Sequence, residues 1–170
     1  MYCPACGHQN EPGSDACANC MLSLSHLGES APHDRVERSL TAESVAALNP
    51  RVPVTVPHHA DLGSAIRLMI DRGVGAVLVV EWTGALVGIL TERDFLTKVA
   101  GQPGYAALPV REFMTRDPET VEPADTLAFA LGKMDSGGYR HLPVVENDRP
   151  IGVISVRDIL RHITLLCQNG

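Results

Sequence analysis

The sequence carries the heptapeptide GILTERD at Gly88–Asp94 and a second form of it, GVISVRD, at Gly152–Asp158. Both consist of a glycine, two apolar residues, a hydroxyl residue, two variable residues and an aspartate. Each one completes a short apolar run of strand character and opens a segment that we expect to be helical. The sequence therefore predicts the same strand-to-helix junction at two places in the chain.

The chain around these heptapeptides is a repeat. VAALNPRVPVTV at 45–56 aligns with VREFMTRDPETV at 110–121, an offset of 65 residues. The next segments, 61–73 and 126–138, show helical spacing of apolar residues and end in glycine, which predicts an amphipathic helix with a glycine C-cap in each repeat. The predicted buried faces are Leu62, Ala65, Ile66, Met69 and Ile70 in the first helix, and Leu127, Ala130, Leu131 and Met134 in the second.

Apolar runs after each helix predict strands, at 76–80 and 85–90 in the first repeat and at 141–145 and 150–155 in the second. With a strand before each helix, every repeat becomes a β-α-β-β-α unit of about sixty residues, which buries little surface by itself. We therefore expect an α/β fold in which two units pack as a pseudo-twofold pair with two equivalent clefts.

The hydroxyl and carboxylate of each heptapeptide allow two interpretations. Thr91 with Asp94, and Ser155 with Asp158, fit a capping box at the start of a helix. Aspartate is one methylene shorter than the glutamate or glutamine that usually ends such a box, which argues against capping as the whole explanation.

The second interpretation is a nucleotide site. A capping box does not require glycine three residues earlier, yet Gly88 and Gly152 both stand there, and glycine at a strand end lets a ligand approach the backbone. A carboxylate accepts hydrogen bonds from two ribose hydroxyls, and the free amides of a helix N-terminus favour phosphate. The two interpretations are compatible, because a capping carboxylate can also serve as a ribose site.

Four of the five cysteines form two C-x2-C pairs within the first twenty residues. Two such turns can present four thiolates to Zn²⁺ in a tetrahedron. Two disulfides are the alternative, although nothing else in the chain suggests secretion. His8 is a spare candidate ligand that we expect to be an exposed loop residue, and the fifth cysteine, Cys167, is expected to be packed in a C-terminal helix. The predicted metal ligands are Cys3, Cys6, Cys17 and Cys20.

Composition limits the classes of function. The chain is 45% apolar with a formal net charge of -6, and no apolar run approaches the twenty residues of a membrane span. No basic segment followed by an apolar stretch opens the chain, so we expect a cytoplasmic protein without a secretory signal. Residues 1–34 contain no Lys or Arg, which argues against nucleic acid as a partner. No activated nucleophile, paired acids or phosphate loop is found, so we expect no enzyme.

Residues 45–162 resemble a tandem pair of CBS domains, also called a Bateman module, and the heptapeptides are similar to its ribose-contact motif. The N-terminal segment resembles the short zinc ribbons, with Met21 where that family usually has glycine. We expect a ribbon at 1–24, a linker at 25–44 with a helical start near Arg35–Leu40, and repeats at 45–106 and 107–168.

The CBS resemblance implies a regulatory module that binds an adenosine-containing ligand such as AMP, ADP, ATP, NAD or S-adenosylmethionine in a cleft between the repeats. It also implies a homodimer formed through the repeats and a regulated protein partner. Ribose contacts would come from the two heptapeptides, and the first strand of each repeat would line the adenine pocket. The residues that the resemblance implies are Thr91, Asp94, Ser155 and Asp158 for ribose, and Thr55 and Thr120 for adenine.

The two clefts are expected to differ. At the offset of 65, Arg140 and His141 stand where the first repeat has Gly75 and Ala76. The guanidinium of Arg140 suits phosphate oxygens, and His141 adds a donor. A surface ion pair of Arg140 with an acidic residue, such as Glu146, is the alternative. At the level of the whole protein, the alternative to a nucleotide sensor is a dimerisation scaffold whose ribbon recruits a partner.

Overall fold

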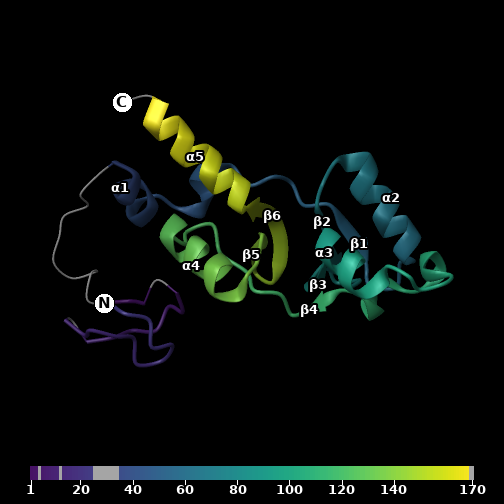
Figure 1. Ribbon diagram of the computed structural model, residues 1–170, viewed down its shortest axis with the longest axis horizontal. Coiled ribbons are helices and arrows are strands. Elements are labelled where there is room, and N and C mark those ends of the chain that lie inside the picture. Colours follow the sequence, from purple (N-terminus) through teal and green to yellow (C-terminus); the bar gives the residue numbers. More distant parts are fainter. Residues whose placement is uncertain (4, 12, 25–34, 169–170) are drawn as a thin grey trace. The chain divides into compact units, whose positions relative to one another are not determined.

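The computed structural model describes residues 1–3, 5–11, 13–24 and 35–168 (Figure 1). It confirms the predicted α/β class, with helices and two sheets. The chain divides into two compact units, which we describe separately. The first-repeat unit comprises Arg51–Thr120 and Pro143–Val153, and the second-repeat unit comprises Met1–Pro50, Val121–Leu142 and Ile154–Gly170.

A four-stranded sheet forms the centre of the first-repeat unit. Its order is β1 (Thr55–Pro57), β2 (Ala76–Val80), β3 (Leu86–Thr91) and β4 (Thr115–Arg116). β1 and β2 are parallel, and helix α2 (Leu62–Arg72) connects them, as parallel neighbours require a crossover. β2, β3 and β4 pair antiparallel.

Helix α2 begins and ends where the sequence predicts. The Asp61 carboxylate accepts a hydrogen bond from the Ser64 amide at 2.7 Å, and Gly73 ends the helix in the left-handed conformation. Of the predicted apolar face, Ile70 is 73% exposed, contrary to the prediction. At about 100° per residue, Ile70 lies about 80° from Leu62 around the helix, on the flank of the buried face rather than its centre.

The chain after β3 differs between the two repeats. In the first, a short helix α3 (Glu92–Asp94) widens into a π-helical turn at Phe95–Val99. Two 3-10 turns, Tyr105–Ala107 and Val110–Glu112, then return the chain to β4. In the second repeat, helix α5 (Val156–Gln168) runs without interruption.

Three helices contact one another in the second-repeat unit: α1 (Arg35–Ala42), α4 (Leu127–Gly137) and α5. The second sheet consists of β5 (His141–Glu146) and β6 (Arg149–Ser155), and residues 143–153 of it are assigned to the first-repeat unit. Leu127 and its buried neighbours Ala130 and Met134 follow the predicted face of α4.

Eight of the twenty residues of the predicted linker form helix α1, which includes the predicted helical start at Arg35–Leu40. Residues 25–34 lie outside the described residues, whereas α1 is tied to α5 by a contact of 2.8 Å between Ser39 Oγ and His162 Nε2. Glu43 Oε2 lies 3.3 Å from the same nitrogen, and the Glu43 carbonyl accepts from the Leu127 amide at 3.0 Å. Ser39 is buried as a result.

Two further expectations are wrong. Thr120 was predicted on the first strand of the second repeat, but residues 118–120 belong to no strand, and regular pairing is limited to an isolated bridge at Val121. A proline at position 118 interrupts the segment, because proline cannot donate to a ladder. Cys167 is exposed, because it lies near the end of α5. Within the described residues, no helix combines the length and hydropathy needed to cross a membrane.

Candidate ligand and metal sites

The first heptapeptide forms a complete capping box. β3 ends at Thr91, whose Oγ1 accepts from the Asp94 amide at 3.3 Å. In return, Asp94 Oδ2 accepts from the amide of Thr91 at 2.9 Å and from its hydroxyl at 2.6 Å. The carboxylate is therefore held directly over the first turn of the helix.

The second heptapeptide repeats the carboxylate side of this arrangement. Asp158 Oδ2 accepts from the Ser155 amide at 2.8 Å and from the Ser155 hydroxyl at 2.6 Å. The expectation that aspartate is too short for a capping box is therefore wrong. Side chains in a helix point back toward its N-terminus, which brings the third residue of the helix over the cap. A carboxylate offers about four lone-pair positions, so capping leaves acceptor capacity for a ligand.

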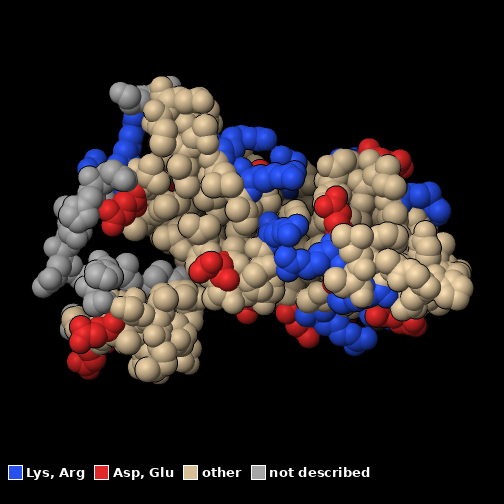
Figure 2. All heavy atoms as spheres, in the orientation of Figure 1, with Lys and Arg blue, Asp and Glu red and all other residues tan. Residues whose placement is uncertain are grey.

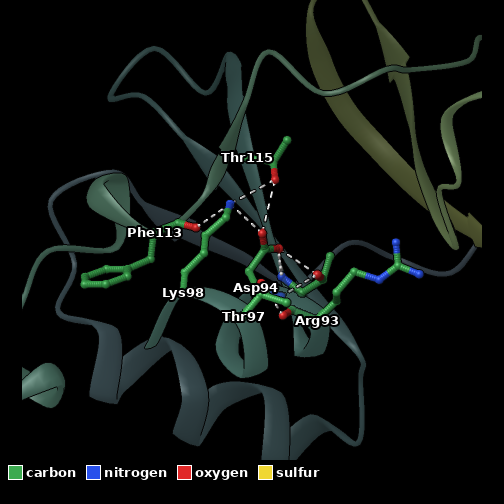
Figure 3. A network of polar contacts seen from close by, with 7 residues as sticks. Arg93, Asp94, Thr97, Lys98, Phe113 and Thr115 are labelled. Carbon is green, nitrogen blue, oxygen red and sulfur yellow. Dashed lines mark hydrogen bonds and ion pairs between the residues drawn. The ribbon is translucent and has the colours of Figure 1, made fainter. Parts of the chain in front are cut away.

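A lysine engages the second oxygen of Asp94 (Figure 3). Lys98 Nζ lies 2.6 Å from Asp94 Oδ1 and donates to the Phe113 carbonyl at 3.0 Å. The hydroxyl of Thr115 donates to Asp94 Oδ1 at 3.2 Å and lies 3.4 Å from Lys98 Nζ. We call these contacts the Lys98 clamp. Sequence reasoning missed it, although a lysine four residues after an aspartate in a helix is a recognisable ion-pair spacing.

The Lys98 clamp determines the protonation of Asp94. Burial raises the pKa of the Asp94 carboxyl, but hydrogen bonds from Lys98 and Thr91 outweigh the burial and hold the pKa below its ordinary value. The ionised carboxylate therefore stabilises the folded state above its unfolded pKa of about 3.9, and this contribution is lost as the pH falls through the lower folded pKa.

We expect Asp94→Asn to lower the free energy of unfolding by roughly 1.5–3 kcal/mol at pH 6, because it removes hydrogen bonds to a charged group. The difference from wild type should shrink below a pH of about 4. Urea unfolding at several pH values measures it, with Asp135→Asn, an exposed aspartate of α4, as the matched control. An equal difference at pH 3 and pH 6 would contradict this assignment.

Gly88 has a structural explanation that needs no ligand. A Cβ built at this buried glycine would lie within 2.9 Å of Met114 Cγ and closer still to its sulfur. β4 follows Met114 directly and pairs with β3, with Gly88 opposite Arg116, so the methionine side chain occupies the space beside the glycine. Packing against Met114 is therefore sufficient to explain the glycine at the first junction.

Arg140 lies against the second heptapeptide. Its carbonyl accepts from the Val156 amide at 3.2 Å, one residue after Ser155. The Gly75 carbonyl accepts from the Glu92 amide at 3.1 Å in the same way, which supports the alignment of Gly75 with Arg140. Arg140 itself is exposed.

The alternative pairing of Arg140 with Glu146 conflicts with the strand between them. β5 extends from His141 to Glu146, and a strand of this length separates the two residues by about 20 Å. Two side chains cannot bridge that distance. Of the remaining predicted residues, Thr55 is exposed on β1, whereas His141, Thr120 and Ser155 are half-buried and Gly152 is buried on β6.

The four N-terminal cysteines form one cluster. Their sulfurs all lie within 4.8 Å of one another, with Cys3 and Cys20 Sγ atoms at 3.5 Å and Cys6 and Cys17 Sγ atoms at 3.5 Å. Four thiolates at about 2.3 Å from a zinc ion have sulfurs about 3.8 Å apart, so the donor set fits tetrahedral zinc. His8 is exposed and lies outside the cluster, as expected.

The two C-x2-C turns share one backbone pattern. The Gly7 amide donates to the Cys3 carbonyl at 2.9 Å, and the Met21 amide donates to the Cys17 carbonyl at 2.9 Å. Gly7 has a φ of 67° and Met21 a φ of 60°, so Met21 adopts the left-handed conformation that glycine favours. The departure from the ribbon pattern at Met21 therefore leaves the turn intact.

Asn10 is hydrogen-bonded to the cysteine cluster. It matches the asparagine of the ribbon pattern, but the sequence did not assign it this contact. It is buried, donates from Nδ2 to Cys17 Sγ at 3.6 Å and accepts from the Ala18 amide at 2.9 Å. Burial raises the pKa of the Cys17 thiol, but hydrogen bonds from the Cys20 and Asn19 amides and from Asn10 outweigh it and lower the pKa to about 6. Such donors favour the thiolate that a metal requires.

Comparison with known proteins identifies the family to which the two repeats belong. The sequence profile of the CBS domain matches residues 45–101 and 110–165. The chain belongs to the CBS domain family. CBS domain pairs are regulatory modules, and the N-terminal cysteine cluster of this member is consistent with a zinc ribbon.

Several CBS proteins are similar to the matched region. The CBS domain-containing protein CBSCBSPB5 of Arabidopsis thaliana is 43% identical over 109 residues, 63% of this chain but 20% of that relative's length. A putative signal-transduction protein with CBS domains from Burkholderia ambifaria is 33% identical, with a TM-score of 0.67 over 72% of this chain and 95% of that chain. A CBS domain pair solved in complex with 5'-methylthioadenosine and S-adenosyl-L-methionine is 24% identical, with a TM-score of 0.65 over 72% of this chain and 96% of that one.

Proposed function

We propose that this chain is a regulatory module that binds an adenosine nucleotide through its CBS repeats. The observation that carries the proposal is the hydroxyl–carboxylate pair at a helix N-terminus, which is present in both repeats with nearly the same geometry. Both carboxylates are fixed by the cap before any ligand arrives, so little side-chain entropy is lost when a ribose diol binds. Adenosine is the class to test first, because a CBS pair of the same fold was solved with adenosine derivatives.

The chemistry assigns a different task to each group. The Asp158 carboxylate accepts from ribose hydroxyls, and Ser155 lies beside it. The amides at the start of α5 and the guanidinium of Arg140 suit phosphate oxygens. Thr55 and Thr120 contribute to the adenine contacts, Gly152 lets the ligand approach the strand, and His141 adds a donor.

Binding regulates only if the ligand prefers one conformation of the chain to another. The N-terminal ribbon, held by structural zinc, is the region suited to transmit the change to a protein partner. Residues 1–34 carry no Lys or Arg, and the ribbon exposes acidic side chains on the face drawn in Figure 2, so the partner is a protein rather than a nucleic acid. A homodimer formed through the repeats completes the proposal.

A thermal-shift panel tests the function. Zinc-loaded full-length protein is heated with AMP, ADP, ATP, NAD or S-adenosylmethionine, and with inorganic phosphate and guanosine nucleotides as controls. We expect at least one adenosine ligand to raise the melting temperature, because a ligand at a hundred times its Kd stabilises a folded protein by about 2.7 kcal/mol. No shift with any adenosine ligand would contradict the proposal.

A second function, a scaffold without nucleotide, is favoured by one observation. Tyr2 and Met21 of the ribbon are 70% and 76% exposed, and Met21 holds a backbone conformation in which glycine would be less strained. Exposed apolar side chains of this kind suit a protein partner. The thermal-shift panel separates the two functions, because the scaffold requires no response to nucleotides.

Arg140→Ala is expected to weaken AMP binding roughly tenfold, because it removes a charge-assisted hydrogen bond to phosphate. It should also flatten the salt dependence of AMP binding and leave adenosine binding nearly unchanged. Calorimetry at two salt concentrations measures both effects, with Arg67→Ala, an exposed arginine of α2, as the matched control. Equal losses for adenosine and AMP would assign Arg140 to the shape of the site rather than to phosphate.

A further inference from the structure

The cysteine cluster is built from two turns with the same backbone pattern, which we call the first and the second knuckle. In the first knuckle, the amide of Cys3 donates to the His8 carbonyl at 2.8 Å. In the second knuckle, the amide of Cys17 donates to the Leu22 carbonyl at 2.8 Å. Each knuckle therefore begins at a cysteine and closes with an equivalent hydrogen bond, so their positions can be compared one by one.

The tips of the two knuckles carry different side chains. The first knuckle has Gly7 and His8 where the second has Met21 and Leu22. Both apolar side chains of the second knuckle are open to solvent, because Met21 is 76% exposed and Leu22 is 41% exposed. Exposed apolar patches that are rimmed by polar residues mark interaction sites. The second knuckle therefore offers a surface that the first knuckle lacks.

The backbone at Met21 is strained, which is an independent sign that its side chain has a use. Met21 has a φ of 60°, in the left-handed region where a Cβ meets steric strain and glycine does not. Gly7, at the corresponding position of the first knuckle, has a φ of 67° and is free of this strain. Strained residues concentrate at functional sites. Met21 is not one of the four metal-ligand candidates, so its use lies outside the metal site.

The charge around the second knuckle is negative. The Leu24 amide donates to the Asp15 carbonyl at 2.7 Å, which places Asp15 on the hairpin that carries the second knuckle. The side chains of Asp15 and Glu11 are exposed, and neither forms an ion pair within the part of the chain that the structure describes. Four thiolates around one Zn²⁺ add about two further negative charges. A partner of complementary charge therefore presents Lys or Arg to this surface.

We propose that the second knuckle is the docking site for a cationic segment of a partner protein, an apolar side chain of which contacts Met21 and Leu22. Lys or Arg side chains that flank this apolar anchor face the carboxylates of the ribbon, Asp15 among them. The apolar contact holds the segment, whereas the charges accelerate its association and exclude acidic partners. This inference rests on the proposed role of the ribbon and deepens it, but it does not require nucleotide binding by the repeats.

Fluorescence anisotropy on the zinc-loaded full-length chain tests the inference. The probe is a labelled synthetic peptide in which two leucines are flanked on each side by lysines. Two control peptides replace the leucines with serine or the lysines with glutamate. We expect saturable binding of the lysine–leucine peptide that weakens as salt is added, and at least about tenfold weaker binding of both controls. Absence of binding, or equal binding of the serine peptide, would overturn the inference.

Met21→Gly is the decisive variant, because glycine suits the left-handed backbone and leaves every cysteine in place. It should retain its zinc, keep or raise the melting temperature of the ribbon, and bind the probe at least about fivefold more weakly. His8→Ala changes an exposed tip residue of the first knuckle and is the matched control, with binding expected to stay within about twofold of wild type. Unchanged binding in Met21→Gly, or an equal loss in His8→Ala, would contradict the assignment.

Other occupants and other failures give different results. If Met21→Gly lowers the oligomeric state in sedimentation experiments, the second knuckle contacts a second copy of this chain, and the inference is wrong. Loss of the peptide result with an intact response to adenosine ligands would count against the inference alone. Intact peptide binding without any response to adenosine ligands would count against nucleotide binding alone.

Discussion

Removal of zinc is expected to unfold the N-terminal ribbon. Among the described residues of this segment few apolar side chains are buried, namely Cys3, Cys17 and Leu24, so their packing alone cannot offset the entropy lost on ordering the chain. Structural zinc contributes an apparent folding free energy of roughly 10–16 kcal/mol in small domains. Protein purified without chelator should therefore contain one zinc per chain by elemental analysis, and a chelator should abolish the ribbon's dispersed amide signals in NMR spectra.

Cysteine substitutions sharpen this test. Cys17→Ser should lose the zinc and unfold the ribbon, because the oxygen of serine is a poor substitute for a thiolate. Cys167→Ser is the matched control, since this cysteine is exposed on α5 and lies outside the cluster. It should retain one zinc. Two disulfides found by mass spectrometry in protein kept under reducing conditions, or full zinc content in Cys17→Ser, would contradict the metal site.

Asp158→Ala is expected to weaken adenosine binding strongly while leaving it measurable at high ligand concentration. Two ribose hydroxyls donate to this carboxylate in the proposed complex, and each charge-assisted hydrogen bond contributes roughly 1.5–3 kcal/mol. The loss should therefore exceed a hundredfold in Kd. The substitution also removes the hydrogen bonds that the Ser155 amide and hydroxyl donate to Asp158 at the start of α5, which lowers the free energy of unfolding by about 1 kcal/mol. Calorimetry with adenosine, below the melting temperature of the variant, measures the binding loss.

A modified ligand separates ribose contact from damage to the fold. If Asp158 holds the diol, wild type should bind 2'-deoxyadenosine at least tenfold more weakly than adenosine, whereas Asp158→Ala should no longer distinguish the two. Thr164→Ala, farther along α5, provides a control in which the distinction between the two ligands persists. A variant that still prefers adenosine would show that the heptapeptide only caps the helix.

Repetition in the sequence was sufficient to predict most of the elements. The helical spacing of Leu62, Ala65 and Met69 identified α2, and the same spacing from Leu127 identified α4, because burial of one helix face leaves a direct trace in residue order. The glycines that end both helices were predicted for the same local reason. The cysteine cluster was also predicted, since its donors are close together in the chain.

Other features depended on contacts between distant segments. Helix α1 has polar composition, and its place in the fold follows from the contact of Ser39 with His162, which are 123 residues apart. Ile70 fits the helical period yet is exposed, because the width of the buried face is set by the neighbouring elements. The exposure of Cys167 has the same origin, since an apolar pattern near a helix end does not say whether another element covers it.

The sequence by itself determined the two junctions, their hydroxyl–carboxylate pairs and the cysteine cluster, because each is encoded in short local motifs whose residue types and spacing are sufficient. Only the tertiary structure decided how the two junctions differ. β4 brings Met114 and Thr115 beside Gly88 and Asp94, and the π-helical turn directs Lys98 onto the same carboxylate. These contacts join segments some twenty residues apart through sheet pairing, and sheet register cannot be read from a heptapeptide that is nearly the same in both repeats.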